Sequence, residues 1–209
     1  ANWRLHVRLH ETAGTQGCSG RIVPEDSAAS DQSQGMSLTP AEFEQRLALV
    51  YRNNIQGFVE LVSVDRLSGG ASQETYRIVI RTESGEISQA MRRSPGGAHS
   101  EPVAGHPGLP VEAWLFQCAQ DAGIPEPTVY YVLEESDGLG DGFIMEWLDG
   151  EALGARIVRS ERYASLREDL AYECGKVLAR IHAIDLHKTG LRQKLDVMSP
   201  EFFVQQTWD

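Results

Sequence analysis

The hydrophobic period of this sequence changes close to Asp149 and Gly150, and that change limits the folds the chain can adopt. Before this point, short apolar runs alternate with polar residues and are separated by polar or glycine-rich turns, which is typical of β-strands. Beyond it, apolar residues recur at helical spacing over about five turns, namely Leu166, Leu170, Cys174, Val177, Leu178 and Ile181. A strand-rich part followed by a helix-rich part predicts an α+β fold.

The strand-rich part opens with a helix signal. Thr39-Pro40-Ala41-Glu42 is a capping box with proline at the first helical position, and it predicts a helix that ends near Asn54. Three strands follow at 58–67, 75–81 and 87–93, and their short connections predict an antiparallel meander. The next predicted elements are a long loop over 95–110, a helix over 111–122, and a hairpin formed by 129–133 and 142–147.

The beginning of the chain differs from the rest. Residues 14–35 are rich in Gly, Ser, Gln and Asp and show no sustained hydrophobic period, so we expect residues 1–35 to form a leader outside the folded domain. Met36 directly precedes the first helix signal, and we expect the folded part to begin there. Residues 36–148 then form a first, strand-rich lobe, and residues 149–209 belong to a helical one.

The charge of the chain excludes several classes of partner. The 19 Lys and Arg residues against 30 Asp and Glu residues give a formal net charge of −11, without the basic stripe that nucleic acid or an anionic membrane surface requires. The sequence has neither a long apolar stretch nor a secretory signal, so we expect a cytoplasmic protein. The three cysteines are widely spaced and no metal-binding histidine motif occurs, so we expect neither a zinc site nor a disulfide framework.

Gly69 and Gly70 lie in a loop that joins two strands. A Walker A loop or a dinucleotide-binding fingerprint would join a strand to a helix, so neither motif fits. One interpretation is an ordinary turn. The other is a hairpin that covers nucleotide phosphates, with a cation from the third strand and a carboxylate from the next helix; Arg92 and Glu112 stand at those positions.

These segments together resemble the aminoglycoside phosphotransferase family, the small-molecule branch of the protein-kinase-like fold. The resemblance covers about residues 63–191 and rests on S-G-G-A-S-Q-E-T-Y, A-M-R-R-S-P-G-G, P-V-E-A-W-L-F, F-I-M-E-W-L-D-G and L-A-R-I-H-A-I-D-L, in family order. The sequence R-R-S-P-G-G is similar to kinase-like domains associated with acyl-CoA dehydrogenases. The resemblance implies a protein-kinase-like N-lobe built from an antiparallel sheet and a helix, followed by a hinge and the start of a helical C-lobe.

The resemblance also implies roles for individual residues. Gly69, Gly70, Ala71 and Ser72 would form the nucleotide-positioning loop. Arg92 would replace the usual lysine and contact the α- and β-phosphates, although its neighbour Arg93 could be the arginine that faces them, because strand side chains alternate. Glu112 would pair with that arginine; the alternative is a solvated carboxylate favoured by the helix dipole.

A hinge is implied at Met145-Glu146-Trp147-Leu148-Asp149-Gly150. The carbonyl of Glu146 and the amide of Leu148 would hydrogen-bond the adenine edge, whereas an edge strand that ends in a turn would give a similar sequence. His182 and Asp185 are spaced as a catalytic pair, but the resemblance implies that this histidine is structural.

The catalytic loop of the family, H-G-D-x-x-x-x-N, does not occur before Asp209. We therefore expect a fragment that contains no catalytic residue and holds no metal by itself, with its Mg²⁺ ligands beyond residue 209. The expected function is the ATP-binding part, or GTP-binding part, of a small-molecule kinase that transfers the γ-phosphoryl group to a substrate hydroxyl. The alternatives are a non-catalytic kinase-like domain that binds nucleotide or a partner protein, and an unrelated α+β interaction domain with ordinary turn glycines.

Overall fold

The computed structural model describes residues 38–68, 73–99, 106–196, 199–201 and 204–205. The chain divides into two units, Ala1–Met36 and Ser37–Asp209, and the description concerns the second. The predictions for residues 1–35 and for the loop 69–72 lie outside the described residues. The division into lobes near residue 148 stays a prediction.

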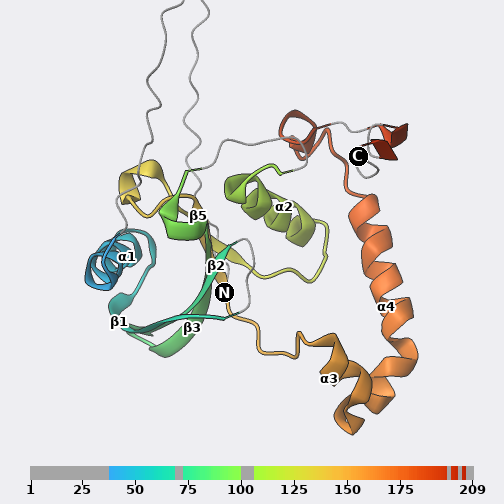
Figure 1. Cartoon of the computed structure of the whole chain (residues 1–209), viewed down its shortest axis with the longest axis horizontal. Helices are drawn as coiled ribbons and strands as arrows, with labels where there is room; N and C mark the ends of the chain where they lie inside the picture. Colours follow the sequence, from blue (N-terminus) through green and yellow to red (C-terminus); the bar gives the residue numbers. More distant parts are fainter. Residues whose placement is uncertain (1–37, 69–72, 100–105, 197–198, 202–203, 206–209) are drawn as a thin grey trace, which may run out of the picture. The chain divides into compact units, whose positions relative to one another are not determined.

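The strand-rich part of the chain is built on a five-stranded antiparallel sheet with the order β1-β2-β3-β5-β4 (Figure 1). The strands are β1 (Phe58–Arg66), β2 (Glu74–Thr82), β3 (Gly85–Arg93), β4 (Val129–Val132) and β5 (Gly142–Glu146). The predicted meander of the first three strands and the predicted hairpin of the last two are confirmed. The sequence did not predict that β5 pairs with β3, which joins meander and hairpin into one sheet.

The principal helices are α1 (Pro40–Asn54), α2 (Leu109–Asp121), α3 (Gly154–Arg159) and α4 (Ala164–His182). The capping box of α1 is present: Glu42 N donates to Thr39 Oγ1 at 3.3 Å, and Thr39 N donates to Glu42 Oε2 at 2.8 Å. α2 begins at Leu109, earlier than predicted, because a proline in the first helical turn loses no helical hydrogen bond. Pro95–Gly97 forms a short 3-10 turn within the predicted loop.

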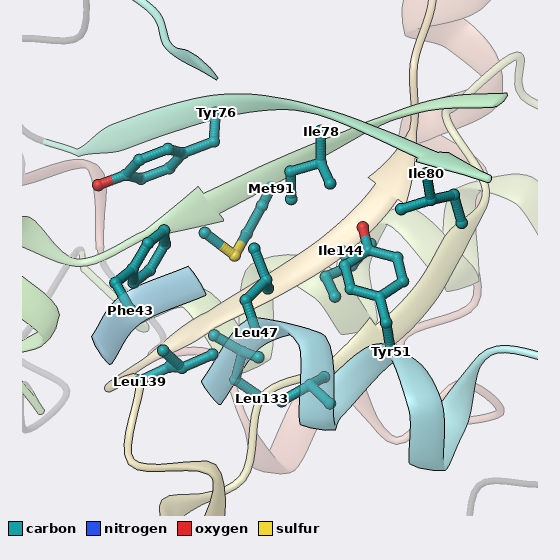
Figure 2. Packing of buried hydrophobic residues seen from close by; sticks show 11 residues of the cluster. Phe43, Leu47, Tyr51, Tyr76, Ile78, Ile80, Met91, Leu133, Leu139 and Ile144 are labelled. Atoms are coloured by element: carbon teal, nitrogen blue, oxygen red, sulfur yellow. The ribbon is translucent and has the colours of Figure 1, made fainter. Parts of the chain in front are cut away.

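The main hydrophobic core lies between α1 and one face of the sheet. Figure 2 shows Phe43, Leu47 and Tyr51 of α1 directed at strand residues. Those strand residues are Tyr76, Ile78, Ile80, Met91 and Ile144, each at most 9% exposed. Three of them, Tyr76, Ile78 and Ile80, were predicted to share one face of their strand, and the alternation of buried and exposed residues in β2 confirms it.

A second, smaller core lies between α2 and the opposite face of the sheet (Figure 1). Leu109 and Ala113 of α2 pack against Val129 and Phe143 of the strands. The ring of Phe116 meets that of Phe143 edge to face at 5.8 Å between centroids. The sheet is therefore covered on both faces, and side chains that alternate along β3 or β5 enter two different environments.

The helical part contains the predicted long helix as α4. Among its contacts with the first part of the chain, Arg180 Nη1 donates to the Gly123 carbonyl at 2.9 Å. Farther along, the indole N–H of Trp114 donates to the Thr189 carbonyl at 3.1 Å. The apolar side chains that defined the helical period are largely exposed, including Leu166, Leu178 and Ile181.

Candidate functional site

Arg92 forms an ion pair with Glu112 across two elements. The Arg92 side chain leaves the face of β3 that α2 covers, and Nη1 donates to Glu112 Oε1 in the first turn of α2. Both side chains are partly accessible, with 31% of Arg92 and 26% of Glu112 exposed. Glu112 is therefore a paired carboxylate, and the interpretation of it as merely solvated is wrong.

Arg93 lies on the opposite face and is buried. Its guanidinium stacks over the ring of Phe43, with 4.8 Å between Cζ and the ring centroid. Nε donates to the Leu139 carbonyl at 2.6 Å, and Nη1 pairs with Glu74 Oε2 at 3.2 Å. Because all these partners belong to the α1 side of the sheet, Arg92 and not Arg93 is the arginine that can meet a ligand beside α2.

Glu74 is the buried carboxylate that pairs with Arg93. Besides Arg93, it accepts a hydrogen bond from the Tyr76 hydroxyl at 2.9 Å and one from Gly96 N at 3.2 Å, and Arg66 pairs with it at 3.2 Å. Burial by itself raises the pKa of Glu74, but these hydrogen bonds and positive charges outweigh burial and hold the pKa below its ordinary value. Glu74 is therefore ionised near neutral pH.

Gln73 is a partner of Arg92 that the sequence did not predict. Its side-chain oxygen Oε1 accepts a hydrogen bond from Arg92 Nη2. The register of β2 and β3 explains the contact, because Thr75 lies opposite Arg92 and Gln73 precedes the strand. No local sequence signal marked Gln73, because the contact depends on how β2 and β3 pair.

Two further residues missed by sequence analysis lie on the same sheet face as Arg92. Ala90 precedes Arg92 by two positions, so their side chains point the same way, and Ala90 pairs with Met145 of β5. Ala90 is 5% exposed, and Met145 packs with the α2 core. Next to the arginine, the sheet thus presents a small apolar side chain and a long flexible one.

The predicted hinge overlaps the end of β5, because Met145 and Glu146 are the last two residues of that strand. Glu146 N donates to the Thr128 carbonyl at 2.8 Å, and Thr128 N donates to the Glu146 carboxylate at 3.2 Å, so the end of the strand is fixed. Leu148 lies outside any strand and is 57% exposed. Within the described residues its backbone N–H donates no hydrogen bond. The roles of both residues toward adenine stay predictions.

Comparison with known families decides the class of protein. A sequence model of the phosphotransferase enzyme family matches residues 63–204, more than half of the chain.

The chain belongs to the phosphotransferase enzyme family.

No curated protein matches the chain. The phosphotransferase match begins in β1 and extends beyond α4, so it contains Arg92, Glu112, Glu146 and Leu148. The α+β arrangement, with its five-stranded antiparallel sheet, is consistent with a kinase-like N-lobe. No helix within the described residues is long and apolar enough to cross a membrane.

Other polar residues of the chain have local roles. Asp185 accepts backbone hydrogen bonds from Lys188 and His187, at 3.1 and 3.0 Å, which lower its pKa. Asp185 therefore caps a turn next to His182. His99 Nδ1 lies 2.7 Å from Asp141 Oδ1 at the surface. In the part of the chain that the structure describes, no group of three His, Cys, Asp or Glu side chains is placed to hold a metal ion.

Proposed function

We propose that this chain is the nucleotide-binding part of a small-molecule kinase, which transfers the γ-phosphoryl group of ATP or GTP to a hydroxyl group. The observation that carries the proposal is the ion pair of Arg92 and Glu112 in a chain that belongs to the phosphotransferase enzyme family. Kinase chemistry uses such a strand cation, held by a helix carboxylate, to position the nucleotide phosphates.

Arg92 suits a phosphate for electrostatic reasons. Its guanidinium is charged at every physiological pH and carries donors on three nitrogens. The chain as a whole has a formal net charge of −11, so an anionic ligand needs a local cation. Glu112 holds the guanidinium in place before the ligand arrives, and a preorganised charge binds phosphate at a lower entropic cost than a mobile one.

The base of the nucleotide would lie along the same face of the sheet. The partly exposed Met145 offers apolar contact surface on the same sheet face as Arg92, and a flat base buries its ring on such a surface. The Glu146 carbonyl and the Leu148 amide are the proposed hydrogen-bonding partners of the adenine edge. Residues 69–72 are the proposed phosphate loop.

Magnesium would enter with the nucleotide, bound to its phosphate oxygens. The sequence H-G-D-x-x-x-x-N does not occur in these 209 residues. We therefore propose that this polypeptide by itself binds nucleotide without transferring phosphate.

Ligand-dependent thermal stability tests the proposal. A ligand that binds only the folded state at 100 times its Kd stabilises that state by about 2.7 kcal/mol, so ATP with Mg²⁺ should raise the Tm of the wild-type chain. Arg92→Ala and Glu112→Ala should remove most of this increase. Arg81→Ala is the matched control, because Arg81 is an exposed strand arginine that pairs with Glu60 and Glu86.

The alternatives give a different pattern. If ATP leaves the Tm of the wild-type chain unchanged, the proposed nucleotide site is wrong. If ATP raises the Tm of the Arg92→Ala variant as much as that of the wild type, the nucleotide binds elsewhere and Arg92 has no part in it.

A further inference from the structure

The guanidinium of Arg92 is held by two acceptors from two different elements. Nη1 donates to the Glu112 carboxylate in α2, and Nη2 donates to the side-chain oxygen of Gln73 at the start of β2. The third nitrogen, Nε, donates no hydrogen bond within the described residues. The guanidinium is therefore held through both Nη atoms, while 31% of the Arg92 side chain stays exposed.

Two acceptors matter because the guanidinium is a planar fork. A lysine ammonium in this position would be a point charge, and one carboxylate would be enough to place it. An arginine held only through Nη1 can still turn about that contact, and the direction of its Nε edge changes as it turns. The second acceptor removes this freedom, so the plane of the guanidinium and the direction of Nε are both set.

Gln73 is itself firmly placed. The next residue, Glu74, is 7% exposed and forms an ion pair with Arg93. It also accepts hydrogen bonds from the Tyr76 hydroxyl and from Gly96 N. These contacts fix the backbone at the beginning of β2. The Gln73 side chain therefore extends from an anchored position, and its oxygen can define where Nη2 of Arg92 lies.

We propose that Gln73 is a positioning residue for phosphate recognition, which holds Nη2 of Arg92 so that the Nε edge is directed at the nucleotide phosphates. The inference rests on the proposed function, because it names how the same site is organised. Gln73 acts through Arg92 and touches no phosphate itself. Its contribution should therefore depend on the presence of arginine at position 92 and on the presence of phosphate in the ligand.

Affinities for ADP and for adenosine, measured by calorimetry on the full chain, test this role. Because a hydrogen bond to a charged group is among the stronger polar contacts, Gln73→Ala should weaken ADP binding by about 10-fold and leave adenosine binding unchanged. Gln73→Met keeps the length of the side chain but lacks the acceptor. It should change the affinities for ADP and adenosine in the same way as Gln73→Ala. Gln56→Ala, in the exposed turn before β1, is the matched control and should not change either affinity.

The dependence on arginine is tested by a double-mutant cycle. In the Arg92→Lys background, Gln73→Ala should change ADP affinity by less than about 2-fold, because the lysine contacts Glu112 alone. An equal loss in both backgrounds, or an equal loss for ADP and adenosine, would overturn the positioning role and leave nucleotide binding intact. Absence of ADP binding to the wild-type chain would instead overturn the proposed function, and the inference with it.

Discussion

Arg92 and Arg93 are consecutive residues of β3 whose guanidinium groups lie on opposite faces of the sheet. Arg92 pairs with Glu112 of α2 and stays partly accessible, whereas Arg93 stacks over Phe43 of α1 and pairs with the buried Glu74. Successive side chains of a strand point to opposite faces of the sheet. One of these neighbouring arginines can therefore meet a ligand, and the other belongs to the core. The two arginines should therefore respond differently to the same substitution.

Replacement of each arginine by methionine should separate these roles. Removal of one partner from a buried ion pair is strongly destabilising, so Arg93→Met should lower the free energy of unfolding by about 3 kcal/mol. Arg92→Met should lower it by about 1 kcal/mol or less, because the pair with Glu112 is partly solvated. Urea denaturation measures both values. Equal losses would contradict the assignment of Arg93 to the core.

Acid should weaken the fold through Glu74. The pKa of Glu74 is depressed in the folded chain below its ordinary value of 4.5, so its contribution is fully present above that value. The contribution is lost as the pH falls through the lower pKa of the folded state, because the folded carboxylate must then take up a proton.

Glu74→Gln provides the measurement, because the amide does not titrate. The free energy of unfolding of the wild type should exceed that of the variant near neutral pH, and the difference should shrink as the pH falls below 4.5. Denaturant titrations at a series of pH values give this difference. A difference that stays constant with pH would show that the charge of Glu74 has no part in stability.

Gly97 should tolerate a side chain far less well than its neighbour Gly96. Both residues have a positive φ, 76° and 64°, so alanine costs about 1–2 kcal/mol at either position. A Cβ at Gly97 would also collide with the Arg93 guanidinium and lie 2.9 Å from the Leu139 carbonyl oxygen, whereas one at Gly96 meets no atom within 4 Å. Gly97→Ala should therefore lower the Tm clearly more than Gly96→Ala. Equal Tm values would contradict the close packing around Arg93.

Local sequence signals predicted most of the elements of the fold. The capping box at Thr39 placed the start of α1, and the alternation of Tyr76, Ile78 and Ile80 placed the buried face of β2. The pairing of β3 with β5 was beyond such signals, because it joins segments that are far apart in the chain. A hydrophobic period reports which residues are buried, but it does not name the neighbouring strand.

The candidate site shows the same limit. The sequence led to Glu112 and to a pair of arginines, but it could not choose between Arg92 and Arg93. Both faces of β3 are covered by helices, so burial alone does not mark the face that carries the site. Gln73 was missed because its contact with Arg92 depends on the register between β2 and β3.

The most direct test of the nucleotide site is the NMR signal of the Arg92 Nε–H group in the ¹⁵N-labelled chain, assigned through its loss in Arg92→Lys. On titration with ATP and Mg²⁺, this signal should shift saturably with the same Kd as calorimetry gives, because the phosphates accept from this edge. If ATP saturates the chain while the Arg92 signal stays in place, Arg92 does not contact the nucleotide and the account of the site is wrong.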